Sequence, residues 1–263
     1  MKTAAPRLDR VISLERALQL LADLSVHEEG LRVEQLMKLA ELPRTTVYRL
    51  LRTLRGQNFV SFDPATGVWR VGRQAFIVGA VHIHEDSLAS AAAPYLKRVR
   101  DLSRETSNLG LVQGGDVVIL SQVASREINR TSASVGGRVP VVNSGLGKAI
   151  LSTYGREAVD ATANIRGFSR FTLRSIARVN ELHEQLDPAA AAGFAVDDEE
   201  FRPGLRCVAA PVFNSQSEAC CAISVSGLSA RISGERVRVL CTIVEQAAHD
   251  LTLNLGGIVP HRH

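Results

Sequence analysis

Three residues of the types used in nucleophilic catalysis occur in the C-terminal half of the sequence. Cys207 supplies a thiol, His183 could act as its base, and Asp197 could orient that base, which is the chemistry of a cysteine hydrolase. No nucleophile motif surrounds Cys207, however, and sequence alone does not bring the three residues together. We therefore expect no enzyme, and a hydrolase stays a minor alternative that turnover of an ester or amide would reveal.

The segment SGLGKA, residues 144–149, resembles the end of a phosphate-binding loop. The earlier glycine of that motif would fall on Val142, and neither Ser nor Thr follows Lys148. The motif therefore fails. We expect no nucleotide and no other cofactor.

The cysteines and histidines do not form a metal-binding pattern. The four cysteines contain no C-x-x-C pair, so we expect reduced core residues and neither disulfides nor zinc ligands: Cys207, Cys220, Cys221 and Cys241. His82 and His84 are two residues apart and do not share a helix face. A thiol-based redox sensor using Cys207, Cys220 or Cys221 remains the alternative function, although only Arg206 lies beside Cys207 in sequence to activate it.

A basic helix face gives the strongest chemical signal. In ELPRTTVYRLLRTL, residues 41–54, apolar residues repeat at helical spacing and predict a buried stripe of Val47, Leu50, Leu51 and Leu54. Hydroxyl groups and helix N-termini can donate to phosphates, and Arg can bind guanine edges in the major groove. The opposite face therefore predicts contact with DNA through Arg44, Thr45, Thr46, Tyr48, Arg49 and Arg52.

The surrounding elements fit a domain built for that contact. SLERALQLLADL predicts one helix through Leu14, Ala17, Leu18, Leu21 and Leu24, and VEQLMKLAEL predicts a second with Leu36, Met37, Leu39 and Ala40 inward. NFVSFDPATGVWRVG predicts a hairpin whose turn, residues 64–67, touches the DNA backbone. Helix, helix, basic helix and hairpin form a winged helix-turn-helix.

The distribution of charge supports a polyanionic partner for this part only. Residues 1–80 contain 12 Lys and Arg against 8 Asp and Glu, whereas residues 81–263 contain 19 of each kind. The whole chain of 263 residues is 45% hydrophobic, shows no membrane-spanning run and begins without a secretory signal. We therefore expect a cytoplasmic protein.

The rest of the chain predicts a linker and an α+β domain. A linker helix that contacts a second copy covers RQAFIVGAVHIHE, and a further helix runs from DSLAS to RETS with a break near Pro94. NLGLVQ, VVILSQVA, INRTSASVGGRVPVV, FAV, LRCVAAPVF and CCAISVSGL read as strands of an antiparallel sheet, with helices from SGLGKA, over 178–192 and from Gly234. The predicted domains are 1–73, linker 74–90 and 91–263.

Four segments, in this order and spacing, resemble the IclR family of bacterial transcriptional regulators: LPRTTVYRLLRTL, SVGGRVPVVNSGLGKAIL, FAVDDEEFRPGLRCVAAPVF and AISVSG. The resemblance covers essentially the full chain. It implies a winged helix-turn-helix joined to a GAF-like effector-binding domain, assembled as a homodimer or dimer of dimers. Such a protein binds double-stranded operator DNA, and a small metabolite, often a carboxylate or an aromatic acid, modulates that binding.

The resemblance also implies an effector site. The ligand would lie against the backbone of Gly145 and Leu146, with polar contacts from Asp197, Cys207, Ser224 and Ser226 and apolar walls at Ile128, Thr131 and Val139. Leu146 is larger and Thr131 more polar than is usual in the family. A charged Asp197 would repel an anionic ligand, so it either accepts a hydrogen bond from the ligand or faces a neutral one.

Overall fold

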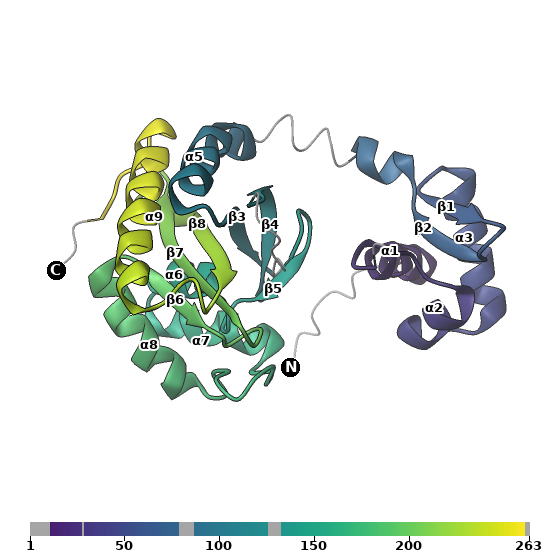
Figure 1. Ribbon diagram of the computed structural model, residues 1–263. Coiled ribbons are helices and arrows are strands. Elements are labelled where there is room, and N and C mark those ends of the chain that lie inside the picture. Colours follow the sequence, from purple (N-terminus) through teal and green to yellow (C-terminus); the bar gives the residue numbers. More distant parts are fainter. Residues whose placement is uncertain (1–10, 28, 79–86, 126–132, 261–263) are drawn as a thin grey trace, which may run out of the picture. The chain divides into compact units, whose positions relative to one another are not determined.

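The computed structural model describes residues 11–27, 29–78, 87–125 and 133–260 (Figure 1). The chain forms two compact units, Met1–Asp86 and Ser87–His263, and each is described by itself. Among the described residues, no helix is long and apolar enough to span a bilayer. The boundaries 1–73, 74–90 and 91–263 stay a prediction.

The N-terminal unit has the predicted order of elements. Three helices, α1 (Ile12–Ser25), α2 (Val33–Ala40) and α3 (Arg44–Gly56), precede the antiparallel strands β1 (Val60–Asp63) and β2 (Val68–Val71). Glu41, in the left-handed conformation, ends α2, and Pro43 caps α3 with the fixed backbone angle that suits a helix start. Residues 73–78 are helical.

The core of this unit surrounds Trp69, which is 1% exposed. Leu20, Leu36 and Leu51 bring the three helices onto it, and Phe62 packs its ring 4.7 Å from the Trp69 ring. Leu39 is 53% exposed, so its predicted inward position is wrong. Leu14 and Leu18, two positions of the predicted apolar stripe of α1, are 56% and 54% exposed. Helix α1 packs through the stripe of Leu20 and Leu24 instead, so the stripe of Leu14 and Leu18 faces away from the unit.

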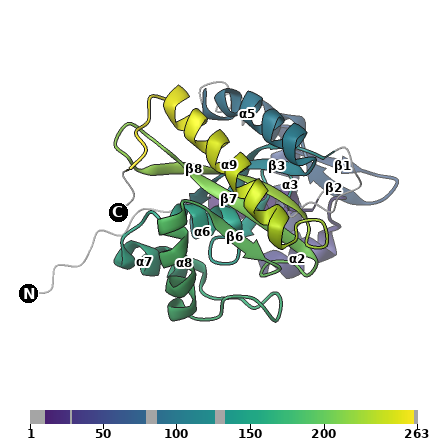
Figure 2. The same ribbon diagram turned by 60° about the vertical axis from the view of Figure 1, so that its left-hand side comes forward.

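The C-terminal unit contains a six-stranded antiparallel sheet in the order β5-β4-β3-β8-β7-β6 (Figures 1 and 2). Its strands are β3 (Thr106–Gln113), β4 (Asp116–Val123), β5 (Arg138–Pro140), β6 (Ala195–Asp198), β7 (Leu205–Phe213) and β8 (Ala219–Leu228). Its helices are α5 (Ser87–Ser103), α6 (Gly145–Leu151), α7 (Arg156–Arg166), α8 (Val179–Ala192) and α9 (Gly234–Asn254).

The helices cover both faces of this sheet. On one face α5 and α9 pack against apolar side chains of β3, β7 and β8, such as Leu109, Val208 and Ile223. On the other face α6, α7 and α8 form a second core with Val117, Ala209 and Ala222. Since successive residues of a strand point to opposite faces, each central strand contributes to both cores.

Two details differ from the predicted elements. Helix α5 continues through Pro94 without a break, because Ala92, Leu96 and Val99 are fully buried against the sheet and hold the helix together where proline removes one backbone donor. Helix α7 was not predicted, and within the described part of INRTSASVGGRVPVV only Arg138–Pro140 is a strand.

Candidate functional site

Helix α3 has a buried face and an exposed polar face. Val47, Leu50 and Leu51 are at most 7% exposed. Arg44, Thr45, Tyr48, Arg49 and Arg52 are exposed and Thr46 is half-buried. At 100° per residue, Thr45 lies almost directly opposite the buried stripe, and Arg49 and Arg52 lie on either side of it. The helix therefore offers two arginines and a hydroxyl along one open face.

The start of α3 leaves backbone donors available. Thr46 and Val47 donate their N–H groups to the carbonyl of Pro43, and no side chain caps the helix. The N–H groups of Arg44 and Thr45 have no acceptor within the helix, as at any helix start, and such groups favour phosphate oxygens. Arg44 itself forms an exposed ion pair with Glu34, 3.2 Å away, a pair of the kind that contributes little to stability.

The hairpin beside α3 has an ordered turn. Asp63 accepts hydrogen bonds from the Ala65 N–H (2.9 Å) and the Thr66 hydroxyl (2.7 Å), which hold the exposed turn of Pro64, Ala65 and Thr66. Tyr48 meets Trp69 edge to face, with ring centroids 6.2 Å apart. The turn and the polar face of α3 are therefore fixed to the same aromatic core.

The C-terminal unit brings together the five polar or small residues predicted for the effector site. They come from α6, β6, β7 and β8 on the α6 face of the sheet: Gly145, Asp197, Cys207, Ser224 and Ser226. Asp197 pairs in register with Cys207, Cys207 with Ser226, and a Cβ atom added at Gly145 would lie 3.0 Å from the Cys207 sulfur. Only glycine allows α6 to come this close to β7 without displacing Cys207.

Sequence reasoning missed Asn108 of β3, which lies beside both serines and pairs in register with Ser224 of the neighbouring strand β8. Its side-chain amide donates to the oxygen atoms of Ser224 (3.3 Å) and Ser226 (3.2 Å), and its own oxygen accepts from Gln122 (2.8 Å). Each serine oxygen therefore accepts a hydrogen bond from Asn108, which leaves its own O–H group to donate. The O–H group of Ser224 has the Cys207 sulfur as a partner. A polar residue within the apolar pattern of NLGLVQ was the only signal in the sequence.

The apolar positions of the predicted site lie in the neighbouring core. Leu146 is 4% exposed and Val139 of β5 is 3% exposed, and both belong to the core between α6 and the sheet. Ile128 and Thr131 lie outside the described residues, so their place in the site stays a prediction.

Asp197 is 3% exposed, and burial raises its pKa to about 7. The charge of Glu200 adds to this rise, while Lys148 opposes it. The carboxyl group therefore keeps its proton to a higher pH than an ordinary aspartate does. The expected repulsion between Asp197 and an anionic ligand is correspondingly weaker, because the protonated group can donate a hydrogen bond.

Two further charged residues are buried beside Asp197. The Lys148 ammonium donates to both oxygens of Glu200, at 2.6 and 2.7 Å, and to Gln185 at 2.5 Å. The Glu200 N–H donates to Asp197 (2.8 Å), and Ser175 donates to the Glu200 carbonyl (2.7 Å). Lys148 therefore holds the turn after β6 in place and is not available to a phosphate group.

The cysteine trio considered above is not assembled as a catalytic site. The imidazole of His183 lies 2.8 Å from Asp160, which joins α8 to α7. Burial and the nearby Asp197 raise the pKa of Cys207 to about 12, so its thiol stays protonated. Among the described residues, no cluster of His, Cys, Asp and Glu could hold a metal ion.

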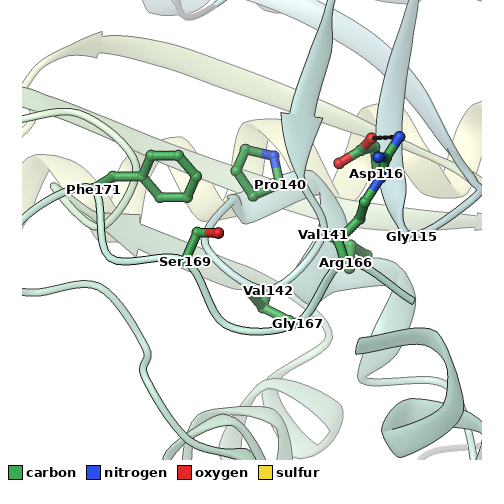
Figure 3. Close-up of a pocket in the computed structure, with 9 residues that line it drawn as sticks. All are labelled: Gly115, Asp116, Pro140, Val141, Val142, Arg166, Gly167, Ser169 and Phe171. Atoms are coloured by element: carbon green, nitrogen blue, oxygen red, sulfur yellow. Dashed lines mark ion pairs between the residues drawn. The ribbon is translucent and has the colours of Figure 1, made fainter. Parts of the chain in front are cut away.

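A separate cavity of about 280 Å³ lies beside β4 and β5, at one edge of the sheet (Figure 3). It is lined by the turn before β4, the segment after β5 and the segment after α7. Its two charged residues, Asp116 and Arg166, pair with each other at 3.1 Å, and Asp116 also lies 3.7 Å from Arg138. None of the predicted effector residues lines this cavity, so we do not assign it as the effector site.

Comparison with known proteins agrees with these two units. Residues 13–64 match the model of the IclR helix-turn-helix domain, and residues 80–253 match that of the bacterial transcriptional regulator IclR C-terminal domain. The chain belongs to the IclR family. The N-terminal unit is thus its helix-turn-helix domain and the C-terminal unit its α+β domain.

Curated relatives of this IclR-family protein are repressors. The acetate operon repressor of Salmonella typhimurium is 35% identical over 97% of this chain and 94% of its own length. The transcriptional repressor IclR of Escherichia coli K12 is 34% identical over 97% and 93%. The repressor AllR of the same strain is 32% identical over 93% and 90%.

Solved structures share the whole fold. An IclR transcriptional regulator from Alicyclobacillus acidocaldarius superposes with a TM-score of 0.81 at 25% identity, covering 94% of this chain and all of its own. An IclR homologue from Microbacterium hydrocarbonoxydans, solved in complex with 4-hydroxybenzoate, gives 0.77 at 21% identity, covering 93% and 99%. At that identity it supports the fold alone.

Proposed function

We propose that this IclR-family regulator is a repressor that binds operator DNA through α3 and is released by a small anionic effector bound beneath α6. The polar face of α3 is the observation that carries the DNA-binding half of the proposal. Arg49 and Arg52 would meet base edges or phosphates, and the helix start and the turn of Pro64 to Thr66 would meet the backbone. The relatives named above are repressors, which favours repression over activation.

A salt titration of operator binding tests this surface. If Arg49 binds a base, Arg49→Ala costs roughly 1 to 3 kcal/mol on the operator and relaxes specificity at one position. If it meets only phosphate, binding weakens on every sequence and the slope of log K against log salt falls by about 0.9. Arg156→Ala, an exposed arginine of the C-terminal unit, is the matched control. Unchanged affinity and slope in Arg49→Ala and Arg52→Ala would refute the assignment of α3.

Exposed apolar side chains of the N-terminal unit support assembly with a second copy. Leu14 and Leu18 of α1 lie exposed, and Phe76, Ile77 and Val78 are 71%, 42% and 53% exposed. Monomers rarely leave such groups open to water, and a two-fold dimer would cover them. One recognition helix contacts few base pairs, so a dimer would bind more of them by using two half-sites, which should lie one or more helical turns apart.

Sedimentation and footprinting test the dimer. Wild-type protein should sediment as a dimer or dimer of dimers and protect a pseudo-palindromic site. Replacing Leu14 and Leu18 by Glu should lower the association state without unfolding the protein, because neither side chain is in the core. A monomeric wild-type protein that protects one asymmetric site would rule the dimer out.

Hydrogen-bond donors support a compact carboxylate as the effector. Ser226 accepts from Asn108 and so has its O–H group left to donate, and protonated Asp197 can donate as well. Asp197, Ser224 and Ser226 are at most 4% exposed, which favours a small ligand. The DNA partner and such a metabolite both belong to the bacterial cytoplasm.

A thermal-shift screen of small carboxylic acids, each paired with its neutral amide, tests the effector class. A ligand at 100 times its dissociation constant adds about 2.7 kcal/mol to stability. Acids should stabilise the protein and weaken operator binding, while the amides do neither. Stabilisation by amides and acids alike would contradict the preference for an anion.

A further inference from the structure

Cys220 and Cys221 lie at a bulge in β8. Val212 of β7 pairs with Cys221, whereas the next residue, Phe213, pairs with Ala219, so Cys220 is an extra residue with no partner of its own. Successive residues of a regular strand point to opposite faces, but a bulge redirects one of them. As a result both cysteines pack on the side of α5 and α9, and their sulfur atoms lie 4.0 Å apart.

The two thiols differ in burial and in acidity. Cys221 is fully buried, whereas Cys220 is half-buried and lies beside the Val212 carbonyl, 3.4 Å from its sulfur. The hydrogen bond between the sulfurs lowers the pKa of Cys220 to about 7 and raises that of Cys221 well above its usual value. Cys220 is therefore the more acidic thiol of the pair and Cys221 the less acidic one.

Oxidation to a disulfide requires one acidic, accessible thiol and a second thiol close to it. The thiolate is the nucleophile, and a thiol whose pKa is near the ambient pH combines a large thiolate fraction with high reactivity. A second thiol nearby can resolve the first oxidation product. The other cysteines lack these properties, because burial raises the pKa of Cys207 to about 12 and that of Cys241 to about 11.

We propose that Cys220 and Cys221 form an oxidation site for hydrogen peroxide and small alkyl hydroperoxides, independent of the effector site. The Cys220 thiolate attacks one peroxide oxygen, the O–O bond breaks, and the Cys220 sulfenic acid forms while hydroxide or alkoxide leaves and takes up a proton. The Cys221 sulfur then attacks the Cys220 sulfur, a disulfide forms, and water leaves with the Cys221 proton. With hydrogen peroxide, two thiols lose two hydrogen atoms and two waters form.

The product would be easily reversed. Adjacent Cα atoms are about 3.8 Å apart, below the range of about 4.4 to 6.8 Å that disulfides prefer. A disulfide between neighbouring residues is therefore strained and more readily reduced. Reduction by a cellular dithiol would restore the bulge.

Peptide mass spectrometry of the full-length protein tests the site. Cleavage after Arg206, Phe213 and Arg231 separates Cys207 from the pair and leaves Cys241 on another peptide. After brief treatment with hydrogen peroxide at pH 7, the peptide beginning at Asn214 should lose two hydrogen atoms, while Cys207 and Cys241 remain thiols. Iodoacetamide should alkylate Cys220 at least about tenfold faster than Cys241, with a midpoint near pH 7.

Three variants separate the roles. Cys220→Ser should prevent oxidation of the peptide, Cys221→Ser should leave a sulfenic acid on Cys220 that dimedone traps, and Cys241→Ser should behave as wild type. Circular dichroism melting checks that each variant is folded. Oxidation of Cys241 or Cys207 as fast as Cys220 would overturn the proposal, and so would unchanged oxidation of Cys221 in Cys220→Ser.

Discussion

The ammonium group of Lys148 lies 2.6 Å from the nearer oxygen of Glu200, and their side chains are only 2% and 5% exposed. The pair joins the first turns of α6 to the turn that follows β6. Burial raises the pKa of Glu200, and the charge of Lys148 opposes that rise. One buried ion pair thus holds α6 against the turn after β6, and these two segments bear Gly145 and Asp197 of the proposed effector site.

Removing one member of this pair should destabilise the C-terminal unit strongly. In Glu200→Gln the ammonium group of Lys148 is left buried without its counter-charge, at a cost of about 3 to 5 kcal/mol. Trp69 is the only tryptophan and lies in the N-terminal unit. Urea unfolding should therefore shift the far-ultraviolet circular dichroism transition of the C-terminal unit, while the Trp69 fluorescence transition stays in place.

An exposed pair gives the matched control. Arg156 and Asp187 are 2.9 Å apart, but their side chains are 65% and 64% exposed. Asp187→Asn should change stability by less than about 1 kcal/mol. Equal losses of unfolding free energy in Asp187→Asn and Glu200→Gln would mean that burial does not raise the cost of breaking the Lys148 pair.

Asp197 should make stability depend on pH. Its pKa is raised from 3.8 to about 7 on folding, so between about pH 4 and pH 7 the unfolded chain loses a proton that the folded protein keeps. The contribution of Asp197 to the free energy of unfolding is therefore fully present below about pH 4. It falls by up to about 4 kcal/mol as pH rises to about 7. Asp197→Asn has no proton to lose, and its stability should fall less over this range.

The comparison is made by urea unfolding of both proteins at several pH values, because other groups titrate equally in each. Relative to the wild type, Asp197→Asn should gain stability from pH 4 to pH 7, and the difference should then stay constant. Parallel curves would show that folding leaves the pKa of Asp197 at its ordinary value.

Ser226→Ala should weaken an anionic effector by roughly 10-fold to 150-fold, since a hydrogen bond to a charged group contributes about 1.5 to 3 kcal/mol. Operator affinity without effector should hardly change, because Ser226 lies in the other unit. Calorimetry with and without operator measures both. The matched control is Ser229→Ala, just beyond the end of β8. Wild-type effector affinity in Ser226→Ala would place the site elsewhere.

Gly145→Ala should cost about 1 to 3 kcal/mol through overpacking, because the added Cβ lies 3.0 Å from the Cys207 sulfur. The cost should shrink in a Cys207→Ala background, where the methyl group fills the vacated space. Gly155→Ala has open space around its added Cβ and should be nearly neutral. Equal costs of Gly145→Ala in both backgrounds would contradict the contact with Cys207.

The spacing of apolar residues along the sequence predicted most of the strands and helices. The apolar runs LRCVAAPVF and CCAISVSGL became β7 and β8 almost residue for residue. The polar face of α3 followed from helical spacing. Leu14 and Leu18 are exposed although they belong to the apolar stripe, because periodicity shows that a helix has such a stripe but not whether the core of its own unit covers it.

Contacts between distant residues could not be predicted from such patterns. Asn108 reaches Ser226 from 118 residues away, and Lys148 reaches Glu200 from 52 residues away. Both depend on the order of strands in the sheet. The bulge at Cys220 depends on the register between β7 and β8, which the spacing of residues does not reveal.

Neighbouring residues of β3 connect the proposed effector site to the helix at the start of the C-terminal unit. Asn108 points to the serines, whereas Ser107, directly before it, donates to the Leu96 carbonyl of α5 at 2.7 Å on the opposite face. A rotation of β3 about its own axis, driven by a ligand pulling on the serines, would tilt both side chains at once. If the proposed metabolite binds there, β3 would couple it to α5, the helix nearest the DNA-binding unit in sequence.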